Sequence, residues 1–481
     1  MTEPNSPDAA SPDTVFDSIE AASERWIDEG RAYKKALNDW LDGIYIDRQS
    51  PATPEPAESR QDMAGYVLEQ IRALNHRGEH ARLRELFPPD NDPMDWDGKV
   101  WAVSQAAFLP DGRIACTIGM PHEPRRVHVL EGNDASVLEG AILFGRSHDK
   151  RYFAFAHVDR IEVRHGWDGE VVATLPYPDS YGNAFAQAHP DVRDGLRELD
   201  GAGWRIHQLV VFPDGRRVAM ASAAGIFVVG EQGAQLLVPE ADAYARQLDD
   251  DDPDGKDGFV MSLSYPHVDV SADGRYIATG EQDSSHLIFH EVDGAWTQMA
   301  AVEPRASYPC LARFNHLLTD ADGVPQPEVA LASCHFSRSA TLSLPLANLS
   351  PGFEASGYEA DDTLNYVDDR HWASSLLPSK VGYFIGAQNG YIWMKSHQGY
   401  QFGYLHVGGS VLDLDLSEDR KTLLVASYSG QLVQFRAPDE EVPMFITEKN
   451  VERPDPYLIT NSRLKDVKRH LFLIDEAPMV W

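Results

Sequence analysis

A strand-turn-strand pattern recurs along most of the chain. Residues 221–230 (ASAAGIFVVG), 386–395 (GAQNGYIWMK) and 426–435 (ASYSGQLVQF) each contain a short apolar run, a turn ending in glycine and an alternating apolar strand. A small sheet made from such a unit cannot bury its own faces, so copies must stack against one another. The repeat therefore predicts stacked sheets and says little about activity.

Seven candidate units begin near residues 106, 141, 209, 268, 311, 382 and 411. Asp111, Asp214 and Asp273 each precede Gly-Arg at a corner where a turn needs positive φ, and Asp149 and Asp419 occupy the same corner without the glycine. The corners at Asp111 and Asp149 lie 38 residues apart, about the length of a four-stranded blade. We therefore predict an all-β fold, a seven-bladed β-propeller over residues 100–481, closed by residues 96–103 or by residues 468–481.

This pattern resembles bacterial β-propellers of the WD-repeat-like group. The resemblance is carried by residues 212–216 (FPDGR), by the related segments 108–113 and 269–275, and by residues 167–170 (WDGE). The last segment lies where a WD-repeat blade turns from its third strand to its fourth. The chain lacks the repeated Gly-His and Trp-Asp dipeptides, which argues against the eukaryotic scaffold subtype. The resemblance implies a fold and leaves function open, since propellers include both enzymes and scaffolds.

The N-terminal part has a different period. Residues 1–13 are Pro-rich and are predicted to be disordered, and residues 14–90 form a predicted helical segment. Apolar residues recur every three or four positions over 14–45 and again over 60–87, with a Pro-rich break between them. Pro88 and Pro89 end the second stretch. We expect a helical hairpin that docks on the propeller or presents a groove to a partner.

Charge and composition limit the classes of partner that the chain could bind. The formal net charge is -33, so we expect the chain to repel nucleic acid and anionic membranes and to attract a basic protein. Solubility alone is a sufficient reason for such an acidic surface. The sequence contains no apolar run long enough to predict a membrane span, and residues 1–16 lack the features of a signal peptide. Cys116, Cys310 and Cys334 have no metal-ligand spacing, and we expect reduced thiols in a cytoplasmic protein.

Two acidic insertions are the candidate partner-binding segments. In the first, Asp250, Asp252, Asp254 and Gly255 match the early positions of a calcium loop. Position twelve would be Met261 where glutamate is required, so we favour a solvated acidic insertion over a calcium site.

The second insertion spans residues 353–372 and mixes aromatic and acidic side chains. Rings supply contact area and carboxylates supply steering, a combination that suits a basic partner. The alternative is an ordinary loop between the fifth and sixth units, with its rings packed on the sheet. The candidate partner-binding residues in this insertion are Tyr358, Asp361, Asp362, Tyr366 and Asp368.

Motifs for catalysis are missing from the sequence. It contains no Gly-x-Ser-x-Gly elbow and no phosphate-binding or dinucleotide glycine loop. His286 and His290, four apart on a predicted strand, would lie about 13 Å apart, too far to share a metal ion. His76 and His80 have helical ligand spacing but no third ligand nearby, and we interpret both pairs as surface histidines. We predict no catalytic residue, cofactor or metal.

The sequence therefore favours a non-catalytic protein-binding propeller with a basic partner. Large propellers with an N-terminal helical segment and an apolar C-terminal end resemble some proteins found beside secreted toxins, which implies a bacterial immunity or regulatory protein. Two alternatives stay open. One is a metal-dependent lactonase or hydrolase, which needs several ligands converging at a channel mouth. The other is a general assembly scaffold.

Overall fold

In the residues that the structure describes, three α-helices precede the β-sheets. The computed structural model describes residues 16–45, 54, 56–89, 100–178, 205–238, 263–335, 338–359, 361–407, 409–437, 468–474 and 476–481. The first predicted helical stretch contains α1 (Ile19–Tyr45), and the second contains a 3-10 turn (Gln61–Met63), α2 (Ala64–His76) and α3 (His80–Leu86). The prediction of one continuous second helix was wrong. Gly78 adopts φ +69, and the Glu79 N–H bonds the Leu74 carbonyl, which ends α2.

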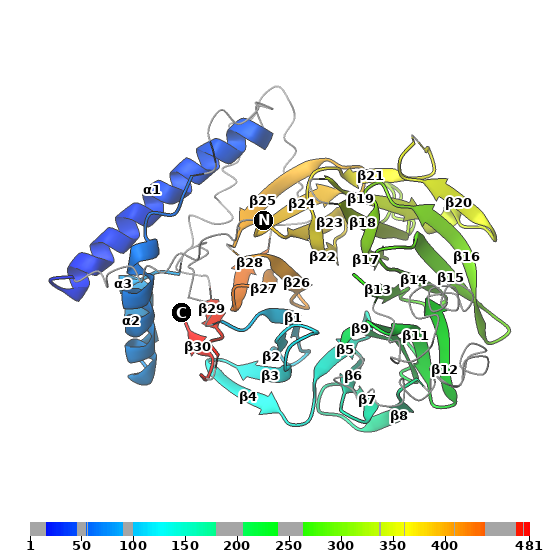
Figure 1. Cartoon of the computed structure of the whole chain (residues 1–481), viewed down its shortest axis with the longest axis horizontal. Coiled ribbons are helices and arrows are strands. Elements are labelled where there is room, and N and C mark those ends of the chain that lie inside the picture. Colours follow the sequence, from blue (N-terminus) through cyan, green and yellow to red (C-terminus); the bar gives the residue numbers. More distant parts are fainter. Residues whose placement is uncertain are drawn as a thin grey trace, which may run out of the picture.

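The strands in the described residues form six hydrogen-bonded sheets, arranged in a ring in Figure 1. The first contains β1 (Val103–Phe108), β2 (Ile114–Ile118), β3 (Arg126–Glu131) and β4 (Asp134–Leu138). The second contains β5 (Leu143–Arg146), β6 (Tyr152–Ala156), β7 (Arg160–His165), β8 (Val171–Pro176), β9 (Ile206–Val211), β10 (Arg217–Ser222), β11 (Gly225–Gly230) and β12 (Gly233–Val238). The third contains β13 (His267–Val270), β14 (Tyr276–Gly280), β15 (His286–Val292), β16 (Ala295–Glu303) and β20 (Phe353–Ser356).

The other three sheets complete the ring. The fourth contains β17 (Tyr308–Asn315), β18 (Glu328–His335), β19 (Arg338–Pro345) and β21 (Asn365–Asp368), with a 3-10 turn at Leu346–Asn348. The fifth contains β22 (Ala373–Pro378), β23 (Gly382–Ala387), β24 (Tyr391–Ser396) and β25 (Gln401–His406). The sixth contains β26 (Val411–Leu416), β27 (Thr422–Ser427), β28 (Gln431–Arg436), β29 (Lys468–Leu471) and β30 (Met479–Val480).

The three strand-turn-strand segments are antiparallel hairpins, as predicted. They correspond to β10–β11, β23–β24 and β27–β28. The Asp-Gly-Arg corners are also confirmed, because Gly112, Gly215 and Gly274 adopt φ of +87, +70 and +72. Lys150 and Arg420 hold the equivalent positions at φ +55 and +58. At each of these corners the aspartate accepts the N–H two residues further on, which stabilises the turn without help from the rest of the sheet.

The first strands of the antiparallel runs, β1, β5, β9, β13, β17, β22 and β26, surround the centre of the ring in Figure 1. Asp413 and Asp415 on β26 accept the N–H groups of Ala106 and Phe108 on β1, at 3.0 and 2.7 Å. Asp269 on β13 accepts the Phe314 N–H of β17 at 2.8 Å. Arg146 of β5 donates to the Ala106 carbonyl of β1, and Arg146 and Val210 form the parallel bridge between β5 and β9. The Gln208 side chain of β9 accepts the Val268 N–H of β13. The Asn315 side chain of β17 donates to the Ser379 carbonyl, and the Ser374 hydroxyl of β22 donates to the Val411 carbonyl of β26. Polar groups therefore connect each inner strand to the next or, at Ser379, to the residue that follows it.

Apolar side chains fill the spaces between neighbouring sheets. Trp167 lies in the turn between β7 and β8, as the sequence predicted, and contacts Phe144, Phe153 and Phe155 edge-on. Its cluster includes Ala107 and other residues of the first sheet. Each sheet thus shields the face of the next from water.

Residues near the end of the sequence join the last sheet to the first and to the helices. β29 pairs with β28, and Val100 forms an antiparallel bridge with Leu473. Of the two predicted closing segments, 468–481 supplies strands, whereas residues 96–99 of the other lie outside the described residues. The Asn75 side chain of α2 bonds both backbone groups of Val480, and Trp481 is buried against Trp26 of α1. No described helix is long and apolar enough to cross a membrane.

Candidate functional site

The insertion at residues 353–372 contributes strands to two sheets. β20 pairs in parallel with β16 at the edge of the third sheet, and β21 pairs with β19 as the outer strand of the fourth. The segment therefore follows the third strand of the fifth unit and itself supplies the fourth strand, β21, so the alternative of an ordinary loop between the fifth and sixth units holds only for the residues after β21. The short β21 was missed because its four residues carry little periodic signal.

The candidate aromatic residues differ in exposure. Tyr358 is 50% exposed, and its backbone N–H bonds the Ser356 hydroxyl. Tyr366 is partly buried: the Arg305 guanidinium lies 5.0 Å from its ring centre, and its hydroxyl donates to the Glu359 carbonyl at 2.9 Å. Tyr358 is therefore the aromatic side chain of this pair that a partner can contact.

The candidate carboxylates also differ. Asp362 is exposed, as are Glu354 and Glu359. Asp361 is partly buried and accepts the N–H and hydroxyl of Thr363. These hydrogen bonds, the hydroxyl first, lower the pKa of Asp361 below its ordinary value. Asp361 is therefore available as negative charge at neutral pH.

Asp368 is a correction to the predicted binding surface. It is 3% exposed and contacts Lys395 and His371, the latter at 2.9 Å. Burial alone would raise the pKa of Asp368, but hydrogen bonds and charges from His371 and Lys395 outweigh it and hold that pKa well below its ordinary value. The internal side chains of Lys395 and His371 already pair with this carboxylate, so it cannot steer a partner. Asp250, Asp252 and Asp254 lie outside the described residues.

A cluster of ion pairs lies at the inner strands. Asp415 pairs with Arg146 at 3.0 Å and with Lys150 at 2.7 Å. Asp269 pairs with Arg313 at 3.3 Å and lies 3.4 Å from His148. The sequence offered one signal for this cluster, a lysine at position 150 where three related corners have glycine.

These pairs bear on the metal-dependent alternative. The carboxylates of Asp269 and Asp415 already contact cationic side chains, which compete with a metal ion for the same oxygens. The part of the chain that the structure describes contains no group of three or more His, Cys, Asp or Glu side chains placed to hold a metal ion. The described geometry therefore gives the hydrolase hypothesis no support.

The histidine pairs were only partly predicted. His286 is 1% exposed and lies 5.6 Å, centroid to centroid, from the buried His267, so its interpretation as a surface residue was wrong. Burial lowers the pKa of His267 to about 4, so its ring is neutral at pH 7. His76 ends α2 and His80 begins α3, so the two do not share a helix. Neither pair belongs to a group of three or more potential metal ligands within the described residues.

Comparisons with known proteins assign no family. No protein-family model matches the chain, and no curated protein matches it. Among solved structures, the crystal structure of Saccharomyces cerevisiae Sqt1 matches with 12% sequence identity and a TM-score of 0.44, covering 80% of this chain and 96% of that chain. At this level of similarity we draw no conclusion about fold or function from the match.

Proposed function

We propose that the protein is a seven-bladed β-propeller that binds another protein and catalyses no reaction. The eight-stranded sheet is joined at its middle by one parallel bridge between β5 and β9, so we interpret it as two four-stranded blades. The other five sheets supply one blade each. Residues 100–481 are the propeller in this interpretation, and residues 14–90 are a helical segment docked on it.

The partner-binding surface of this proposal is the outer part of the insertion. It comprises Tyr358 with the exposed carboxylates of Glu354, Glu359, Asp362 and Asp369, and the partly buried Asp361 beside them. The exposure of Tyr358 is the observation that carries the proposal. A tyrosine that serves only packing would be covered, whereas a half-exposed ring among carboxylates suits an interface anchor.

The proposed partner is a basic protein. Exposed carboxylates around an aromatic anchor attract Lys and Arg side chains, and the net charge of -33 adds long-range attraction. An immunity or regulatory role in a bacterial cytoplasm, with a basic toxin as partner, is the specific form of this proposal. A general assembly scaffold would use the same surface, and the identity of the partner distinguishes the two.

A capture experiment with matched variants tests the proposal. The full chain is immobilised, exposed to lysate of its source organism at low salt, and eluted with rising salt. We expect a basic protein that is retained by the wild type and lost with Tyr358→Ala or with the double variant Glu359→Lys, Asp362→Lys. Loss of an anchoring tyrosine should cost about 2 kcal/mol of binding free energy.

The controls use equivalent side chains elsewhere. Tyr400→Ala removes a 70% exposed tyrosine outside the insertion, and the double variant Asp134→Lys, Glu139→Lys changes the charge equally on the first sheet. Both should bind as the wild type does. Equal losses with test and control variants would show that only overall charge matters, and would reject this surface.

A further inference from the structure

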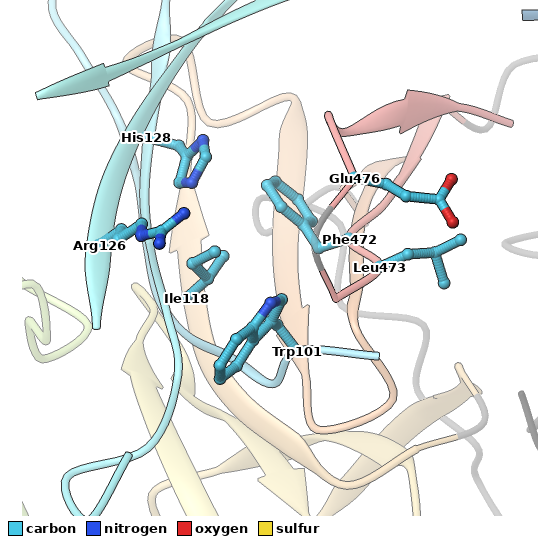
Figure 2. A pocket seen from close by; sticks show the side chains of 7 residues that line it. All are labelled: Trp101, Ile118, Arg126, His128, Phe472, Leu473 and Glu476. Atoms are coloured by element: carbon cyan, nitrogen blue, oxygen red, sulfur yellow. The ribbon is translucent and has the colours of Figure 1, made fainter. Parts of the chain in front are cut away.

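A cavity of about 230 Å³ lies at the seam between the first sheet and the last. Figure 2 shows β3 on one side of it and the segment after β29 on the other. Its lining residues are Trp101, Ile118, Arg126, His128, Phe472, Leu473 and Glu476. Segments distant in sequence meet at this seam, so the side chains that fill it do not come from one repeated unit.

Arg126 and His128 supply one polar wall. They are two residues apart on β3 and therefore project from the same face of the strand, towards Phe472 in Figure 2. His128 is 7% exposed, yet both of its ring nitrogens lack a hydrogen-bond partner. A buried polar group without a hydrogen-bond partner destabilises the folded chain, so we expect a ligand or a solvent molecule to form a hydrogen bond with this imidazole. Arg126 is exposed and forms no ion pair with any residue that the structure describes.

The rest of the cavity is apolar or neutralised. Ile118, Phe472 and Leu473 are buried, and Trp101 is partly buried at the lower end in Figure 2. The opposite carboxylate, Glu476, accepts hydrogen bonds from Arg72 at 2.5 to 3.2 Å. Arg126 is therefore the uncompensated charge at this site.

We propose that this cavity binds a small organic carboxylate with a compact apolar group. The planar guanidinium of Arg126 matches a carboxylate with two parallel hydrogen bonds, and the ring of His128 can donate a further one. Burial, and then the charge of Arg126, lower the pKa of His128, so the neutral ring keeps one donor and one acceptor. The aromatic and branched side chains receive the apolar group.

The size of the cavity restricts the ligand. Pockets for drug-sized molecules span about 300–1,000 Å³, so this smaller cavity suits a ligand the size of one amino-acid residue. Two sources share that chemistry: a free branched or aromatic acid, and the last residue of a peptide with its free carboxylate. This site is independent of the insertion surface, so either can fail without affecting the other.

Isothermal titration calorimetry on the full chain tests the proposal. The probes are 4-methylpentanoate for a free acid, N-acetyl-leucine for a peptide end, and N-acetyl-leucinamide, which lacks the carboxylate. We expect saturable millimolar binding of at least one acid and at least tenfold weaker binding of the amide. Tighter binding of N-acetyl-leucine identifies a peptide terminus, and tighter binding of 4-methylpentanoate identifies a free acid.

Variants connect the binding to the cavity. Arg126→Gln should weaken acid binding at least tenfold, whereas Arg216→Gln, at an exposed arginine of another sheet, should leave it unchanged. His128→Phe keeps a ring of similar shape and should also weaken acid binding. If His128→Phe folds poorly, acid binding by Arg126→Gln still tests the proposal. Absence of acid binding overturns the proposal, including absence because another part of the chain fills the cavity. Equal binding of the amide, or unchanged binding in Arg126→Gln, also overturns it.

Discussion

Replacing Asp415 by asparagine should weaken the ring at its centre. The carboxylate is 5% exposed and has three partners: Arg146 at 3.0 Å, Lys150 at 2.7 Å and the Phe108 N–H at 2.7 Å. Asparagine keeps the shape but removes the charge, so two cations lose their counter-ion. Removing one member of a buried ion pair costs about 3–5 kcal/mol. Because the Arg146 and Lys150 side chains stay 24% and 21% exposed, we expect a loss of about 3 kcal/mol, at the lower end of that range.

Asp413, two residues earlier on the same strand, provides the matched control. It accepts the Ala106 N–H at 3.0 Å, a bond that an asparagine oxygen can replace. Burial raises the pKa of Asp413, and the charge of Arg146 opposes that rise only in part. Arg146 and Lys150 pair with Asp415, and Asp413 forms no ion pair with any described residue, so Asp413→Asn leaves no cation without its paired carboxylate and should cost less than about 1 kcal/mol.

Urea unfolding followed by tryptophan fluorescence and by circular dichroism measures both variants. Coincidence of the two signals checks that the transition is two-state, and an unchanged m-value shows that the difference lies in stability. Lys150→Gln combined with Asp415→Asn should cost less than the sum of the single changes, since the two side chains are in contact. Equal losses for Asp413→Asn and Asp415→Asn, or an additive double variant, would refute the reasoning.

Three further predictions concern stability. Gly215→Ala should lower the free energy of unfolding by about 1–3 kcal/mol more than Gly112→Ala does. Both glycines have positive φ, but only at Gly215 would an added Cβ meet the Tyr152 ring, at 2.5 Å. Thermal unfolding of both variants checks this. Trp481→Ala should cost about 3–5 kcal/mol, because this fully buried indole also donates to the Phe87 carbonyl; limited proteolysis should then cut the helical segment faster, and unchanged cleavage would contradict the proposed docking role. His267 has a pKa of about 4 in the folded chain against about 6.5 unfolded, so its stabilisation is present above pH 6.5 and is lost as pH falls towards 4, by up to about 1.4 kcal/mol per pH unit. Denaturant titrations across that range should show a shallower pH slope for His267→Asn, and an unchanged slope would disprove the assignment.

The local parts of the fold were predictable from the sequence. The Asp-Gly-Arg corners, the glycine-ended hairpins and the position of Trp167 depend on residues within a few positions of each other. Turn geometry and strand alternation act over that range, so short segments carry the information. The break at Gly78 was a local feature that was missed, because apolar residues recur at helical spacing on both sides of it.

The candidate surface was predicted less completely. Tyr358 and Asp362 are exposed as a binding role requires, whereas Asp368 is buried with Lys395, 27 residues later in the chain. Composition marks a segment as acidic but cannot tell which carboxylates meet an internal cation. That depends on which strands pair, and β20 and β21 join two different sheets.

The amino-acid sequence alone determined the repeating unit, its turns and the acidic character of the chain, because these follow from backbone preferences and composition. Only the tertiary structure decided how Asp415 meets Lys150 across 265 positions, how residues 468–481 join the last sheet to the first, and how a cavity with an unpartnered His128 forms at that seam. Such contacts depend on where the closed ring brings distant strands together, and no local pattern in the sequence specifies that.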